Sequence, residues 1–136
     1  MVLVQKSMRP ALAWALLIAA LCLTPGKALP QWQWADLLRV DKLVHMGMFG
    51  VLTVLVARGL LKRRTNELPL VRSLLFAGSF SVLYGASMEV LQEIPGLNRR
   101  GDVIDLIANT AGAVVGALWL RWQLKRKGAL TSAAAR

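Results

Sequence analysis

The sequence is short of cysteine, histidine and acidic residues, and these shortages limit what the protein can be. Its one cysteine, Cys22, lies in an apolar stretch and cannot form a disulfide within the chain. Its one histidine, His45, belongs to no HExxH motif, and no CxxC motif is present. That is a weak signal for a metal, so the sequence leads us to assign no metal ligands and leaves any cofactor unknown.

Apolar residues are abundant instead. They make up 56% of the 136 residues, and the mean hydropathy of +0.51 is high for a soluble domain. Seventeen basic residues against seven acidic ones give a net charge of +10, which might be taken for a nucleic-acid-binding surface. The charges, however, separate apolar runs rather than covering a soluble module. We therefore expect the lipid bilayer as the partner and no nucleic acid.

Four apolar runs approach the length of about 17–25 residues that a helix needs to cross ~30 Å of hydrocarbon. They cover about 10–24, 43–61, 73–92 and 103–124, with Pro25-Gly26 ending the first and Pro95-Gly96 following the third. The predicted fold is an all-α membrane protein, an antiparallel bundle of four short transmembrane helices forming one domain over 1–136. Residues 125–136 are predicted to be a basic cytoplasmic tail. An alternative for 1–28 is a cleaved signal peptide, because Lys6 and Arg9 precede a short apolar stretch.

The basic residues are unevenly placed along this pattern. Assigning the first helix an inside start puts twelve of the 17 on one side, including those of the 58–72 connection and the C-terminal tail. Since the side richer in lysine and arginine is cytoplasmic, both termini are expected inside, in the inner membrane of a bacterial cell. Trp32 and Trp34 then lie at the outer interface, while Trp119 and Trp122 mark the inner end of the last helix.

The acidic residues have the opposite distribution. All except Glu67 are predicted at or near the outer helix ends: Asp36, Asp41, Glu89, Glu93, Asp102 and Asp105. An ionised group at the bilayer centre costs at least ~2.5 kcal/mol, so each one within a helix needs a partner or a function. This outer half is the informative part of the molecule.

Helical spacing shows which polar groups share a face. Asp41 and His45 are four residues apart on the second helix. The third and fourth helices each carry a stripe of polar and small residues at intervals of three and four: Gly78, Ser81, Gly85, Glu89 and Gln92 on one, and Asp102, Asp105, Asn109, Gly112 and Gly116 on the other. Helices two, three and four are therefore predicted to surround an outer polar cluster, with helix one packed outside it.

Part of this pattern has a purely structural interpretation. Gly112 and Gly116 form a GxxxG pair, which lets membrane helices approach closely and is one route to a homo-oligomer. The polar groups would then only hold helices together, with Asn109 bonded to a backbone carbonyl and His45 paired with Glu89.

The order of the motifs resembles the VanZ-like family of small bacterial membrane proteins. The resemblance lies in a DKxxH helix start at Asp41 to His45, an ExxQ helix end at Glu89 to Gln92, and arginines Arg99 and Arg100 before a DxxxN helix. It implies a multi-helix inner-membrane protein whose name-giving relative is an accessory determinant of resistance to teicoplanin, a glycopeptide that targets cell-wall precursors. It implies no particular reaction and does not by itself extend drug resistance to this chain.

The chemistry of the cluster allows several functions. His45, Glu89 and Asp105 form a candidate acid/base set, and Asp41, Gln92 and Asn109 are candidate binding groups beside them. Lys42, Arg99 and Arg100, near free amides at the start of the fourth helix, could hold the phosphate of a lipid-linked envelope precursor. His45 with Asp41, Glu89 and Asp105 is also a weak metal-ligand set. The two main interpretations are a protein that binds or modifies an envelope component, as an enzyme or not, and a structural or assembly subunit. A transporter is less well supported.

Overall fold

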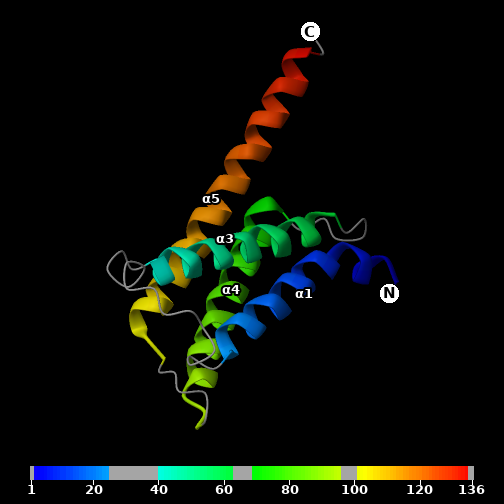
Figure 1. The fold of residues 1–136 in the computed structure, drawn as a ribbon. Helices are drawn as coiled ribbons and strands as arrows, with labels where there is room; N and C mark the ends of the chain where they lie inside the picture. The colour runs from blue at the N-terminus through cyan, green and yellow to red at the C-terminus, as the bar shows by residue number, and fades with distance from the viewer. Residues whose placement is uncertain (1, 25–39, 63–68, 96–100, 135–136) are drawn as a thin grey trace.

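The computed structural model describes residues 2–24, 40–62, 69–95 and 101–134. Within these ranges the chain forms four helices and no strand: α1 (Val2–Leu23), α3 (Val40–Leu61), α4 (Leu70–Gln92) and α5 (Val103–Ala134) (Figure 1). Each contains a stretch long and apolar enough to cross a membrane. The predicted all-α, four-span architecture is confirmed. Trp32, Trp34 and the 25–28 segment considered as a signal cleavage region lie outside the described residues.

All four helices are longer than the apolar runs that predicted them, and α1 and α5 differ most. Helix α1 begins at Val2, although Pro10 inside it cannot donate a backbone hydrogen bond. Helix α5 continues to Ala134, so residues 125–134 extend the last helix and are not a separate tail. Lysine and arginine favour the helix about as strongly as leucine does, and alanine favours it more. Hydropathy alone therefore misplaces the start of α1 and the end of α5. At about 1.5 Å per residue, the 32 residues of α5 span about 48 Å, more than the bilayer core requires.

Side-chain contacts define the two ends of the bundle. At one end, called here the polar end, Gln92 of α4 reaches Cys22 of α1, and Lys42 of α3 reaches Asp105 of α5. At the other, Gly59 of α3 lies beside Met8 of α1, and Arg58 bonds to Gln123 of α5. Successive helices are therefore antiparallel, and both chain termini lie away from the polar end (Figure 1).

Helices α3 and α5 are parallel neighbours that approach closely along a row of glycines. A Cβ atom at Gly112 would collide with the carbonyl oxygen of Met46, and one at Gly116 with the carbonyl oxygen of Gly50. The predicted GxxxG surface is thus buried against α3 within the chain. A homo-oligomer through Gly112 and Gly116 remains a prediction, and it would have to compete with this contact.

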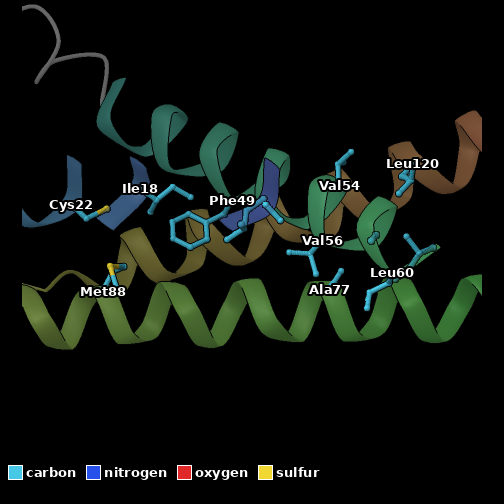
Figure 2. Close-up of a cluster of buried hydrophobic side chains, with 13 residues drawn as sticks. Ile18, Cys22, Phe49, Val54, Val56, Leu60, Ala77, Met88 and Leu120 are labelled. Atoms are coloured by element: carbon cyan, nitrogen blue, oxygen red, sulfur yellow. The ribbon is translucent and has the colours of Figure 1, made fainter. Parts of the chain in front are cut away.

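An apolar cluster fills the space between the helices, with Phe49, Leu52 and Ile18 fully buried (Figure 2). Helix α1 packs on α3 and α4. Near the middle of the helix, hydrogen bonds from Trp14 Nε1 to the Met48 carbonyl at 2.9 Å and from Tyr84 Oη to the Ala15 carbonyl at 2.7 Å help to hold it there. Large apolar side chains cover much of the outer surface, as the lipid-facing side of a bundle requires: Leu16, Leu83 and Val103 are each about 70% exposed.

Candidate functional site

The polar end is held together by one lysine and three carboxylates. The Lys42 ammonium, on the first turn of α3, lies 3.1 Å from Asp41 Oδ2 and 2.8 Å from Asp102 Oδ2, and also pairs with Asp105 Oδ1. The lysine side chain is 18% exposed, whereas those of Asp41 and Asp102 are 57% and 41% exposed. Lys42, predicted to bind an anion, is thus already surrounded by the protein's own carboxylates.

His45 lies one turn deeper on α3 and is buried. Its Nδ1 is 3.1 Å from Oδ1 of Asn109, which is fully buried on α5. Because an amide oxygen only accepts, this contact requires the Nδ1–H tautomer, in which Nδ1 donates to Asn109. The pairings suggested by sequence were therefore wrong: His45 hydrogen-bonds to Asn109 rather than Glu89, and Asn109 accepts from a side chain rather than bonding to a backbone carbonyl.

Glu89 faces the same region from α4. Its side chain is nine-tenths buried, and Oε2 accepts a hydrogen bond from the backbone N–H of Asp102 at 2.9 Å. Oε1 is buried and has no hydrogen-bond partner among the described residues. One oxygen of this carboxylate is therefore fixed by the start of α5, while the other retains its full capacity to accept.

Three of the predicted site residues converge although they come from three different helices. His45 of α3, Glu89 of α4 and Asp105 of α5 each offer a nitrogen or oxygen atom, and these three atoms all lie within 4.8 Å of one another. The helical spacing of each residue predicted its face and depth, and the fold brings the three side chains together.

Other predicted residues have structural contacts. Gln92 is buried and donates from Nε2 to the Cys22 carbonyl at 3.0 Å, which ties α4 to the end of α1. Asp41 is exposed and contacts Lys42. Arg99 and Arg100 lie outside the described residues.

The start of α5 differs from the expected anion site with free amides. The N–H of Gly101 donates to Glu93 Oε1 at 2.9 Å, that of Asp102 to Glu89, and that of Ile104 to Asp102 Oδ1 at 2.8 Å. Carboxylates of the protein itself therefore occupy amides that were expected to attract a phosphate, as acidic groups do at helix N-termini.

The polar contact between Thr53 and Ser81 was not predicted from the sequence. Thr53 Oγ1 of α3 donates to Ser81 Oγ of α4 at 2.8 Å, and both side chains are fully buried. Thr53 lies eight residues after His45 and hence on the same helix face, a spacing that could have identified it. This bond continues the polar contact of α3 with α4 deeper into the bundle.

The charges of the cluster favour a cation over an anion. Among the described residues of the polar end, Lys42 is surrounded by Asp41, Asp102 and Asp105, and Glu89 has no basic partner. Within the described residues, three carboxylates thus contact one ammonium group, and a fourth, that of Glu89, contacts no basic side chain. A buried carboxylate near the hydrocarbon is costly unless positive charge or a hydrogen-bond donor approaches it.

Comparison with known proteins gives one match. The family model VanZ/LLP1 matches residues 3–124, which include most of each of the four helices and every residue of the cluster described above. Among curated proteins and among solved structures, none matches the chain.

Proposed function

This chain belongs to the VanZ/LLP1 family, and we propose that it is a bacterial inner-membrane protein that binds or modifies a lipid-linked or anionic component of the cell envelope. Four apolar helices make it a multi-pass membrane protein. The proposed binding site is the polar end, and the excess of basic residues at the opposite end supports an outer position for it.

The convergence of His45, Glu89 and Asp105 carries the proposal. Most buried polar groups of a bundle pair with one another, as Thr53 and Ser81 do, because an unpaired one is costly. Among the described residues, Ser73 Oγ, Asn109 Nδ2 and Glu89 Oε1 are buried without a hydrogen-bond partner, and of the three only Glu89 Oε1 belongs to a carboxylate, one that lies beside His45. Polar groups with unused bonding capacity inside a membrane are typical of sites for a ligand or a proton.

The arrangement also indicates how a ligand would enter. Asp41 and Asp102 are exposed at the surface of the polar end, and His45 and Glu89 lie deeper and are buried. A headgroup at the outer membrane surface would meet the exposed carboxylates first, and its hydroxyl or phosphate oxygens would then reach the His45 ring. His45 Nε2 and the free oxygen of Glu89 are suited to accept or return a proton from such a group.

Lipid copurification tests this proposal. The wild-type protein is expected to retain a lipid-linked envelope component, identified by mass spectrometry, through purification in mild detergent. His45→Asn and Glu89→Gln should lose that component while reaching wild-type levels in the membrane. Ser87→Ala is the matched control, because Ser87 lies on α4 near Glu89 but is exposed and bonds only to its own helix at the Leu83 carbonyl. Equal retention by all four proteins would rule out this site.

A structural or assembly role is the second candidate. The contacts of Lys42, Gln92 and Asn109 favour it, because each joins two helices. In that case His45→Asn and Glu89→Gln would disappear from the membrane or unfold at lower temperature, and the wild type would copurify no defined envelope component. The same experiment therefore distinguishes the two roles.

A further inference from the structure

We propose that His45, Glu89 and Asp105 bind a divalent transition-metal ion, of the zinc or manganese type, at the polar end. The inference goes beyond the proposed function, which requires no metal. It rests on the convergence of these three side chains, the orientation of the histidine, the unpartnered oxygen of Glu89 and the charge of the surrounding cluster.

The ligand set and its spacing suit such an ion. One imidazole nitrogen and two carboxylate oxygens are common ligands of zinc and manganese, whereas magnesium and calcium prefer oxygen alone. The three candidate atoms lie within 4.8 Å of one another. Around a tetrahedral ion with bonds of about 2.0–2.1 Å, ligand atoms are about 3.4 Å apart. Rotations of the side chains toward a common centre would provide this contraction.

The histidine is already oriented as a ligand. Asn109 Oδ1 accepts from Nδ1 at 3.1 Å, so the lone pair of the neutral ring is on Nε2. Metal-binding histidines nearly always donate their other ring N–H to an oxygen in this way, which fixes both the tautomer and the direction of the ring. Asn109 is fully buried and so holds the ring from a rigid position on α5.

The carboxylates of Glu89 and Asp105 supply the other two candidate ligand atoms. Glu89 Oε2 is held by the Asp102 N–H, and the buried Oε1 has no partner among the described residues. Asp105 Oδ1 pairs with Lys42, and Asp105 also offers a carboxylate oxygen to the three-residue group. A buried acceptor without a donor or cation is destabilising, more so when the group is charged, so an ion here would satisfy the unpartnered oxygen of Glu89.

The charge around the three candidate ligands also favours the binding of a cation. Within the described residues, Lys42 pairs with Asp105, and no basic side chain pairs with Glu89. A divalent cation would offset the charge of these two carboxylates and would explain why Glu89 has no basic partner there. Three protein ligands also leave a coordination position open, as in catalytic zinc sites. If the proposed function holds, a phosphate oxygen of the envelope component is suited to that position, which would let an acidic cluster bind an anion.

Metal binding by the purified full-length protein tests the inference. After treatment with a chelator, the protein in detergent is titrated with Zn²⁺, Mn²⁺ and Mg²⁺ by calorimetry, and Co²⁺ is added as a spectroscopic substitute for zinc. We expect one Zn²⁺ or Mn²⁺ per chain, weak binding of Mg²⁺, and a Co²⁺ absorption spectrum typical of four or five ligands. Loss of outer-shell partners typically lowers metal affinity about 10–100-fold, so Glu89→Gln, Asp105→Asn and His45→Gln should each lower it at least that much.

Glu93→Gln is the matched control. Glu93 is an exposed carboxylate of the polar end that is not one of the three ligands, and glutamine keeps an oxygen that can accept from the Gly101 N–H. The metal affinity of this variant should therefore stay within about threefold of the wild type, a far smaller change than the loss of a ligand causes. Circular dichroism verifies that each variant is folded. If a ligand variant does not fold, the Co²⁺ spectrum and stoichiometry of the wild type still decide the matter. Absence of stoichiometric Zn²⁺ or Mn²⁺ binding by the folded wild type would overturn the site, as would equal binding by Glu89→Gln. Neither result depends on lipid retention, so the two proposals can fail separately.

Discussion

Lys42 holds an unusual position for a lysine, because its ammonium contacts carboxylates of Asp41, Asp102 and Asp105. It starts α3 and joins that helix to the first residues of α5. Its removal would leave three negative groups facing one another at the edge of the hydrocarbon. Lys42 therefore acts mainly to hold α3 against α5, whatever ligand the neighbouring residues bind.

Replacing Lys42 by methionine should lower the free energy of unfolding by roughly 1–3 kcal/mol. Breaking a fully buried ion pair costs about 3–5 kcal/mol, and the value here is smaller because Asp41 and Asp102 are 57% and 41% exposed. Urea or thermal unfolding in detergent micelles measures the change. Lys42→Arg, which keeps the charge, is the control. Adding Asp105→Asn to Lys42→Met should restore part of the loss, and a Lys42→Met protein as stable as the wild type would contradict this account.

For single residues, the sequence predicted the helix face of a side chain better than its hydrogen-bond partner. The intervals between Asp41 and His45, and between Asp105 and Asn109, place each pair on one helix face, and the fold confirms that these faces meet. The partner of His45 was predicted incorrectly because Asn109 and Glu89 are both within plausible reach of a histidine at that depth. Which of the two pairs with His45 depends on the rotation of α5 about its axis. The glycine contacts set this rotation, and the spacing of residues within one helix does not reveal it.

Among the described helices, α3 and α5 make the most extensive contact. Three glycines make it possible, since Gly112 lies against the Met46 carbonyl, Gly116 against the Gly50 carbonyl, and a Cβ at Gly50 would lie 3.0 Å from the Gly112 oxygen. This approach sets the distance between Lys42 and Asp105 and between His45 and Asn109. The glycine row thus positions the candidate site although no glycine belongs to it.

Gly112→Ala should destabilise the bundle by about 1–3 kcal/mol, because the added methyl group meets backbone that cannot rotate away. The unfolding free energy in micelles is the measurement. Gly78→Ala is the control, since a Cβ there meets nothing within 4 Å. In the helix it should be neutral or stabilising by about 0.5–1 kcal/mol. If both substitutions had the same effect, the close approach of α3 to α5 would not be what limits stability.

The sequence predicted the existence and order of the helices well, and their ends less well. A run of apolar residues is a strong signal for a membrane helix, because the bilayer leaves the backbone few other ways to satisfy its hydrogen bonds. Beyond the hydrocarbon that requirement ends, and ordinary helix propensity decides. The stretch Lys125 to Lys127 continues α5 for this reason, and so do the first residues of α1.

The two ends of the whole bundle differ in charge. In the described part of the chain, Lys42 is the one basic residue at the polar end, where it is paired with carboxylates. The opposite end carries exposed lysines and arginines on or directly after all four helices, namely Lys6, Arg9, Arg58, Lys62, Arg72, Arg121, Lys125, Arg126 and Lys127. Arg58 and Arg126 lie over the rings of Trp119 and Trp122, at 5.7 and 4.6 Å from the ring centroids. Such an end is typical of a cytoplasmic membrane surface.

This asymmetry predicts that both termini face the cytoplasm and that the connection between α4 and α5 faces outward. A fluorescent protein fused after residue 136 should therefore fluoresce, and alkaline phosphatase fused at the same position should be inactive, because that enzyme needs an oxidising compartment for its disulfides. Phosphatase inserted between residues 96 and 100 should be active and provides the internal control. The opposite pattern would place His45, Glu89 and Asp105 on the cytoplasmic side. The proposed outer-surface ligand would then be excluded, whereas the metal site, which depends only on the convergence of three side chains, would still be open to its own test.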